Sequence, residues 1–252
     1  MTAERITSRQ NPLLQHLVKL QGSAGERRRC GELVGDGWKL LGEAARYGEL
    51  TAVVYAEGQS LPALPQGVRA AEVPASLLEA VSRMDTPQGV LFIAKRPIEA
   101  TGDIRPGSLI LDGVQDPGNV GTVLRAAEAF GAPMVLLTEG CAAPWGPKTL
   151  RASMGSAFRQ PVMTVPREKV AARCHAAGLQ LLVTALSDTA QPLDRVPLDA
   201  AAVVIGSEGR GVSKTLLDAA DQHVIIPMEG HVESLNAAAA ATVLLWELRR
   251  HR

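Results

Sequence analysis

Residues 203–213 read VVIGSEGRGVS and residues 225–236 read IIPMEGHVESLN. In both stretches a short apolar run passes directly into a loop of glycine, proline and polar residues. Apolar runs of this kind recur along the second half of the chain, at 109–114, 134–138, 179–186, 201–205 and 223–228. Runs this short and this apolar, with helical patterns between most of them, are typical of strands that are covered on both faces. The pattern predicts an α/β fold with a parallel sheet, and ligands of such sheets bind beyond the carboxyl ends of the strands.

The first part of the chain predicts a smaller α/β unit. Helical patterns lie at 12–21, 37–47 and 74–84, and strand patterns at 31–34, 50–55 and 89–94. Residues 97–107 are rich in proline, glycine, threonine and aspartate, a composition typical of a linker. We therefore expect one domain over residues 1–96, a linker over 97–107 and a second domain over 108–252.

The composition is that of a globular chain. It has 252 residues, 46% of them hydrophobic, and 26 basic against 26 acidic residues, which excludes collagen, coiled-coil rods and bulk disorder. The longest apolar run, 235–245, is interrupted by Asn236 and Thr242 and is shorter than the ~20 residues of a membrane helix. The first ten residues show no secretory signal, so we expect a cytoplasmic protein without membrane partners. The three cysteines form no Cys-x-x-Cys pair, and their spacing indicates neither a disulfide frame nor a metal site.

Basic residues are concentrated at the beginning of the chain. Residues 1–30 carry six basic and two acidic side chains, among them the run Arg27–Arg28–Arg29 in what we expect to be a loop. This excess is either a modest footprint for a polyanion or an ordinary solvated surface. Only 3% of residues are aromatic, a content that disfavours a base-stacking platform. Any RNA would be held mainly through its phosphates and its shape.

Three loops carry candidate chemistry, and the first is LDGVQDPGNVGTVLRAAEAFGA, residues 111–132. A strand runs into Asp116-Pro117-Gly118, and Asn119 stands where the N-cap of a helix belongs. In one interpretation Asn119 is only that cap, with Arg125 paired to Glu128 one turn on. In the other, Asn119 and Arg125 anchor a phosphate or ribose at the helix N-terminus.

The second and third loops follow the two stretches quoted first. Gly206, Gly209 and Gly211 lie within six residues, a density that indicates either close backbone approach to a ligand or a plain glycine-rich turn. Their spacing differs from that of the dinucleotide-binding fingerprint. This difference argues against a nucleotide-dependent oxidoreductase. In the third loop Ser234 begins a long alanine-rich helix and is either its N-cap or a site residue. We interpret His231 as a loop residue rather than a ligand or base.

Together the three loops resemble the signature of the SpoU, or TrmH-like, branch of the SPOUT RNA methyltransferases. The resemblance lies in Asn119 with Arg125, in residues 205–209 (IGSEG), and in residues 226–228 (IPM) through 234–236 (SLN), in the order of the family. Residues 148–156 (KTLRASMGS) resemble the segment that connects the first two motifs. The N-terminal domain resembles the family's substrate-binding domain, which is similar to ribosomal protein L30e.

This resemblance implies a SPOUT-type parallel sheet with a C-terminal deep trefoil knot, a homodimer, and S-adenosylmethionine as the cofactor. The implied activity is transfer of a methyl group to a ribose 2′-oxygen of RNA. Cofactor contacts are implied for Gly206, Ile226 and Leu235. The set implied around the reacting oxygen is Asn119, Arg125, Glu208, Ser234 and Asn236.

The separate N-terminal domain favours ribosomal RNA as the substrate. Transfer RNA is the alternative substrate. A knotted RNA-binding or assembly factor without transfer activity is the alternative function.

Overall fold

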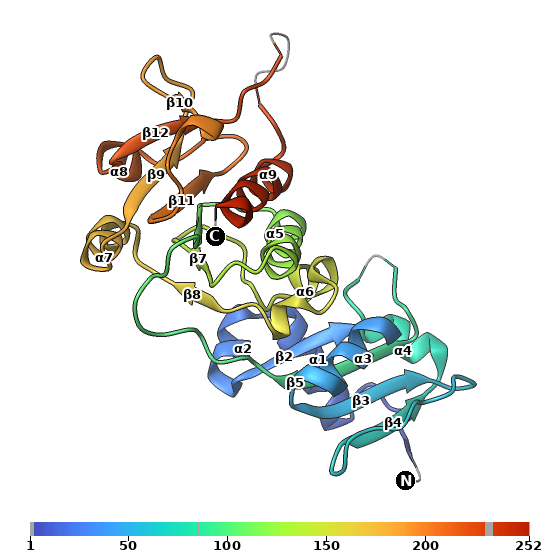
Figure 1. The fold of residues 1–252 in the computed structure, drawn as a ribbon. Helices are drawn as coiled ribbons and strands as arrows, with labels where there is room; N and C mark the ends of the chain where they lie inside the picture. Colours follow the sequence, from blue (N-terminus) through green and yellow to red (C-terminus); the bar gives the residue numbers. More distant parts are fainter. Residues whose placement is uncertain (1–2, 85, 230–233, 252) are drawn as a thin grey trace. The chain divides into compact units, whose positions relative to one another are not determined.

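The computed structural model describes residues 3–84, 86–229 and 234–251 and forms two compact units (Figure 1). The first unit comprises residues 1–98 together with 145–158, and the second comprises 99–144 and 159–252. The division near residue 98 lies within the expected linker. The residues expected to form the second domain, 108–252, do not all belong to one compact unit. One segment of this range folds into the first unit.

The first unit is built on a mixed five-stranded sheet. Its strands are β1 (Glu4–Arg5), β2 (Glu32–Asp36), β3 (Leu50–Ala56), β4 (Arg69–Val73) and β5 (Val90–Lys95), in the order β1-β4-β3-β5-β2. Strand β3 pairs in parallel with β4 and antiparallel with β5. The helices are α1 (Pro12–Gly22), α2 (Ala24–Cys30), α3 (Trp38–Tyr47), α4 (Ala75–Val81), α6 (Pro147–Ser153) and the 3-10 turn η1 (Ser156–Phe158). Strands β1 and β4 were not predicted.

Helix α1 shows how the sequence forms the core of this unit. The side chain of Asn11 accepts a hydrogen bond from the backbone N–H of Leu13, and Pro12 takes the first helical position, so the helix has a defined start. Its leucines recur at helical spacing and form one apolar face, which is fully buried at Leu14, Leu17 and Leu20. That face packs on the sheet in the main core of the unit.

Helix α2 replaces the expected basic loop, and Arg27 within it is a structural residue. Ser23 caps the helix by accepting a hydrogen bond from the backbone of Glu26. Arg27 is 9% exposed, and its Nη1 donates to the carbonyl oxygen of Leu20 at 2.6 Å, at the end of α1. Arg29 pairs with Glu26, whereas Arg28 is exposed. The three arginines therefore do not form a uniform cationic cluster.

The segment 145–158 belongs to the first unit, although it was expected in the second domain. Trp145 is buried and donates from Nε1 to the carbonyl oxygen of Ala157, and Leu150 is fully buried. Arg151 lies 3.9 Å from the carboxylate of Asp36 on β2. Burial raises the pKa of Asp36, and the charge of Arg151 opposes that rise. The segment 145–158 therefore supplies the cation, Arg151, that lies near the buried carboxylate of Asp36.

The second unit confirms the predicted α/β architecture with a parallel sheet. Its strands are β6 (Leu109–Asp112), β7 (Val135–Leu137), β8 (Val162–Thr164), β9 (Gln180–Thr184), β10 (Gln191–Pro192), β11 (Ala201–Gly206) and β12 (Gln222–Ile225). They lie in the order β10-β12-β9-β11-β6-β7-β8, and every pair is parallel. Its helices are α5 (Pro117–Ala129), α7 (Val170–Ala176), α8 (Lys214–Asp218) and α9 (Ala237–Arg250), with 3-10 turns η2 (Arg167–Lys169) and η3 (Leu193–Arg195).

Helices cover both faces of this sheet, as the apolar runs predicted. Ile110, Leu136 and Val204 point to the face that packs on α7 and α8. Because successive strand residues face opposite ways, their buried neighbours Leu109, Leu111 and Val203 point to the other face, where α5 and α9 lie side by side (Figure 1). Ile104 of the expected linker also contributes to the core of this unit.

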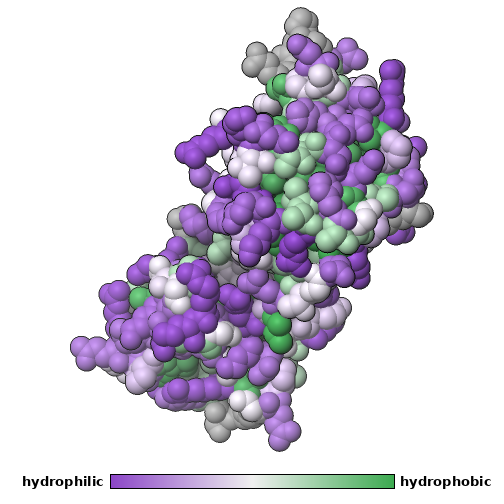
Figure 2. Space-filling view, turned by 90° about the vertical axis from the view of Figure 1, so that its left-hand side faces the viewer, coloured by the Kyte–Doolittle hydropathy of each residue, from purple (hydrophilic) through white to green (hydrophobic). Residues whose placement is uncertain are grey.

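On the face shown in Figure 2, hydrophilic residues cover most of the surface and hydrophobic ones form smaller groups among them. No helix within the described ranges is long and apolar enough to cross a membrane.

The environment of Arg27 predicts an effect on folding stability. Arg27→Ala should lower the free energy of unfolding by about 2 kcal/mol, because a charged donor to buried carbonyl oxygen is lost. Arg28→Ala removes the same side chain from an exposed position of the same helix and should leave stability within about 0.5 kcal/mol. Urea unfolding of both variants measures the difference, and equal midpoints would contradict the structural role of Arg27.

Candidate active site

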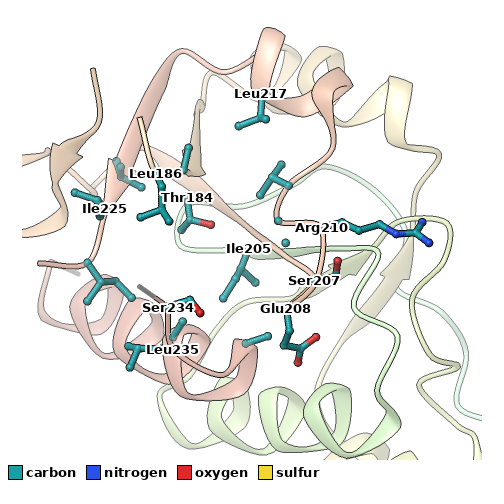
Figure 3. A pocket seen from close by; sticks show the side chains of 18 of the residues that line it. Thr184, Leu186, Ile205, Ser207, Glu208, Arg210, Leu217, Ile225, Ser234 and Leu235 are labelled. Carbon is teal, nitrogen blue, oxygen red and sulfur yellow. The ribbon is translucent and has the colours of Figure 1, made fainter. Parts of the chain in front are cut away.

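A pocket of about 480 Å³ opens at the carboxyl end of β11, inside the second unit (Figure 3). The second and third loops line it together: Gly206, Ser207 and Glu208 come from one, and Ile226, Ser234 and Leu235 from the other. Ile205, Leu217 and Ile225 contribute apolar walls, and the guanidinium of Arg210 points away from them (Figure 3). All three residues predicted to contact the cofactor, Gly206, Ile226 and Leu235, thus line one pocket.

Gly206 is required by the loop itself. A Cβ atom at this position would lie 2.1 Å from the carbonyl carbon of Gly211 and 2.2 Å from the nitrogen of Val212. The backbone of Ser207 also exchanges two hydrogen bonds with that of Gly211, which closes the loop. The glycines predicted a close approach of the backbone to a ligand. The structure shows a close approach of Gly206 to the backbone of residues 211–212. A side chain at 206 would displace residues 211–212 from the wall of the pocket.

Three of the five predicted catalytic residues form one hydrogen-bonded chain beside the pocket. The Nδ2 of Asn119 donates to Oε1 of Glu208, and the Nδ2 of Asn236 donates to Oδ1 of Asn119 at 3.1 Å. These residues come from α5, from the loop after β11 and from the start of α9. Ser234, a fourth predicted residue, is exposed and lines the pocket. Asn119, Glu208 and Asn236, one from each of the three motifs, therefore lie together.

The helix caps differ from the sequence interpretation. Asp116, and not Asn119, caps α5: its Oδ1 accepts from the backbone N–H of Asn119 at 2.8 Å. Asn236, and not Ser234, caps α9 by accepting from the backbone N–H groups of Ala238 and Ala239. With Asp116 as the cap, the side chain of Asn119 is free to bond across the site, and Ser234 has no capping duty.

Arg125 lies on the exposed face of α5. The predicted pair with Glu128 is not formed, because Glu128 accepts from Arg159 instead. Among the residues that the structure describes, Arg125 has no hydrogen-bond or ion-pair partner. Arg125 is not among the residues that line the pocket, and it takes no part in the hydrogen bonds that join Asn119, Glu208 and Asn236. Its guanidinium is available to an anionic ligand.

Asp112 is a residue of this site that the sequence analysis did not select. It ends β6, next to Gly206 on β11, and is 2% exposed. Its Oδ1 accepts from Thr138 Oγ1 and from Arg167 Nε, both at 2.7 Å, and its Oδ2 accepts from the backbone N–H of Ser213 at 2.7 Å. The carboxylate therefore holds the far end of the loop 206–213. The sequence could have indicated this residue, because Asp112 directly follows the apolar residues 109–111 toward the carboxyl end of a predicted strand.

The partners of Asp112 also determine its protonation. Burial by itself would raise the pKa of this carboxyl group, but hydrogen bonds from Ser213, Thr138 and Arg167 outweigh burial, and the net shift is downward. The group is therefore ionised at neutral pH, with one cation and several donors to stabilise it.

The arrangement can bind a polar but nearly neutral ligand. Strand-end backbone groups and apolar side chains line the pocket, an amide–carboxylate chain lies at its edge, and a free guanidinium lies on the neighbouring helix. Gly230, His231 and Glu233 of the third loop lie outside the described residues, so the interpretation of His231 stays a prediction.

A parallel sheet with a pocket beyond its strand ends is the arrangement in which α/β proteins bind their ligands. Residues 107–246 match the SpoU rRNA Methylase family, and the chain belongs to that family. The prediction of a SpoU-type RNA methyltransferase that uses S-adenosylmethionine is confirmed.

Relatives match along nearly the full chain. The 23S rRNA (guanosine(2553)-2'-O)-methyltransferase RlmP of Bacillus subtilis is 32% identical, covering 98% of this chain and 99% of the relative. The 23S rRNA (uridine(2479)-2'-O)-methyltransferase of Streptomyces viridochromogenes is 30% identical, with coverage of 99% and 93%. The crystal structure of the AdoMet-bound rRNA methyltransferase from Sinorhizobium meliloti has a TM-score of 0.84 at 27% identity, with coverage of 99% and 98%.

The hydrogen bonds of Asp112 predict a stability effect with a defined pH dependence. Asp112→Asn should destabilise the protein by about 2–3 kcal/mol at pH 7, because the charge that Arg167 and the Ser213 N–H face is removed. The folded pKa is below the unfolded one, so the contribution of Asp112 is present above about pH 4, the ordinary value for Asp, and is lost as the pH falls through the folded pKa.

Urea unfolding of the wild type and Asp112→Asn between pH 7 and pH 3 measures this effect. The difference between the two proteins should shrink toward the acid end of the series. Asp218→Asn is the control, since Asp218 is exposed and pairs with the exposed Lys214 on the same helix. A difference that is constant with pH would contradict the assignment.

Proposed function

We propose that this protein is an S-adenosylmethionine-dependent RNA 2′-O-ribose methyltransferase that acts on ribosomal RNA. The observation that carries the proposal is the convergence of the second and third loops on one pocket, with Asn119, Glu208 and Asn236 bonded to one another beside it. Incubation with labelled S-adenosylmethionine and separated ribosomal and transfer RNA tests it. Label in transfer RNA alone would favour that substrate, and no label in either would favour an RNA-binding factor without transfer activity.

The pocket fits the cofactor by volume and chemistry. Its volume is within the range of sites for ligands of this size, and its apolar walls suit the adenine ring and the thioether arm. Backbone groups at Gly206 and Ile226 can hydrogen bond to the adenine, while Leu235 supplies an apolar contact. When bound, the cofactor supplies a methyl group on a positively charged sulfur.

The residues of the chain position the ribose and balance its charge. The Asn119–Glu208–Asn236 chain would hold the 2′-hydroxyl in line with the methyl group, which supplies much of the rate by orientation. Ser234 adds a hydroxyl on the opposite loop. Arg125 would bind the neighbouring phosphate and stabilise negative charge on the 2′-oxygen, because a guanidinium stays protonated at neutral pH.

The first unit is proposed to bind the RNA substrate. Its mixed α/β architecture and the exposed basic residues of its N-terminal part, including Arg9 and Arg28, support this role. Arg27 is excluded from phosphate contact by its burial. Relatives named as 23S rRNA methyltransferases over nearly the whole chain favour ribosomal RNA over transfer RNA.

We further propose that the protein is a cytoplasmic homodimer and that its C-terminal part forms a trefoil knot. Helix α9 presents an exposed apolar stripe of Ala239, Val243 and Trp246, spaced as one helical face, and Trp246 is 50% exposed. This stripe is the proposed dimer contact. The packing of α9 on α5 and β11, directly after the loop that lines the pocket, supports the knot.

Arg125 should be necessary for methyl transfer. Arg125→Ala should lower the single-turnover rate at saturating RNA by at least ~100-fold, the scale of a lost catalytic group. Arg125→Lys should recover part of the rate, because a point charge still attracts phosphate although the bidentate fork is lost. If the guanidinium removed the proton itself, Lys would fail almost as badly as Ala.

Arg195→Ala is the control for this experiment, because it removes an equally charged, exposed side chain from a different element, η3, which carries none of the predicted site residues. Melting temperature and cofactor affinity are measured on the same samples. Near-normal turnover in Arg125→Ala would remove Arg125 from the mechanism.

The apolar stripe of α9 predicts the assembly state. Trp246→Glu should convert the dimer to a monomer, because an acidic side chain is placed in the contact. Ile98→Glu makes the same kind of change at a residue that is 95% exposed and should leave the dimer intact. Sedimentation velocity distinguishes the two, and a Trp246→Glu dimer would place the interface elsewhere.

A further inference from the structure

Three side chains with metal-ligand chemistry meet in the first unit, and none of them lines the pocket of the second unit. They are His16 on α1, Cys30 at the end of α2 and Glu32 at the start of β2. One donor atom from each lies within 4.8 Å of the other two, and His16 Nε2 is 2.6 Å from Glu32 Oε2. Among the described residues this is the one such group found. Cys30 and Glu32 are adjacent in space because Gly31 between them adopts a left-handed conformation, φ 65°.

We propose that His16, Cys30 and Glu32 bind a zinc ion. Imidazole nitrogen, thiolate sulfur and carboxylate oxygen are the three donor types that zinc takes in proteins, and a mixed set of this kind disfavours magnesium and calcium, which take oxygen alone. The three side chains are each half-buried, so the site is partly shielded and leaves a fourth position for water. Zinc sites with three protein ligands and an open position are well established.

Neighbouring groups would support the ligands from outside the site. Lys95 Nζ lies 3.6 Å from Glu32 Oε1 and leaves Oε2, the oxygen beside His16, for the metal. The thiol of Cys30 donates to Glu26 Oε1 at 3.5 Å, and zinc binding would break this bond. Arg29 Nη2, which lies 3.3 Å from Cys30 Sγ and is held by Glu26, would then donate to the thiolate. Partners of this kind orient metal ligands and tune their affinity.

Binding needs a small opening of the site and releases one proton. Nitrogen and oxygen ligands of tetrahedral zinc are about 3.3 Å apart, so His16 and Glu32 must separate by less than 1 Å, which side-chain rotation allows. The Sγ–H bond of Cys30 breaks, the thiolate binds the ion and the proton leaves to solvent. In the metal-free pair Nε2–H of the imidazole donates to Glu32 Oε2. On binding, that proton is exchanged through solvent for one on Nδ1, and the imidazole binds the ion through Nε2. Thiolate, carboxylate and Zn²⁺ then sum to zero charge.

A metal at this position would connect α1 and α2 to the edge strand β2. Strand β2 stands at one end of the five-stranded order, and within the described ranges no strand pairs with its outer side. Helix α2 carries the exposed Arg28, and fixing its C-terminal end would fix the position of that side chain. The inference concerns this unit alone and does not depend on the proposed methyl transfer.

Zinc uptake by the full chain tests the proposal. Protein freed of metal with a chelator is titrated with zinc chloride in competition with a chromophoric chelator, and in parallel with cobalt(II) chloride. The wild type should bind one zinc ion per chain, melt at a higher temperature with zinc, and show a sulfur-to-cobalt charge-transfer band. Cys30→Ser and His16→Gln should each weaken zinc binding by at least about 100-fold, and Cys30→Ser should remove the band.

His175→Gln is the matched control, because His175 pairs with Asp221 at 2.9 Å in the second unit as a histidine–carboxylate pair outside this group. It should keep full zinc affinity. The melting temperatures of the metal-free variants show whether each one folds. A folded wild type that takes up no zinc, or a Cys30→Ser variant that binds zinc as the wild type does, overturns the proposal.

Discussion

The burial of one carboxylate, that of Asp112, constrains the site more than any other interaction. A charge removed from water is costly unless donors surround it, and Thr138, Arg167 and the Ser213 N–H supply those donors to Asp112. These partners come from three separate segments of the chain. The requirement fixes the loop after β11 relative to β6, and the wall of the pocket is part of that loop.

The parts of the fold that could be predicted are those whose cause is local. A strand covered on both faces must be apolar throughout, so the runs around Leu109, Val135 and Val203 indicated the central strands of the second unit correctly. The site followed from the same reasoning, since parallel strands bring their carboxyl ends to one edge. The motif residues Gly206, Glu208, Ser234 and Leu235 accordingly line a single pocket.

The parts that could not be predicted depend on partners far along the chain. The spacing of Arg125 and Glu128 favours an ion pair on one helix. In the structure, however, Arg159 donates hydrogen bonds to both carboxylate oxygens of Glu128. Similarly, Arg27 in a basic run indicates a solvated cation, yet the end of α1 supplies carbonyl oxygens that it can satisfy. In both cases a contact with a residue outside the same helix decides where the side chain lies. For Arg125 and Glu128 the local alternative, an ion pair within one helix, is worth only a few tenths of a kcal/mol.

The place of residues 145–158 in the first unit has a consequence for biosynthesis. All strands of that unit are complete by Lys95, but Arg151, the cation beside the buried carboxylate of Asp36, is translated more than fifty residues later. Domains made in order usually fold as they emerge. Here the carboxylate of Asp36 lacks this cation until strands β6 and β7 of the second unit have also been synthesised.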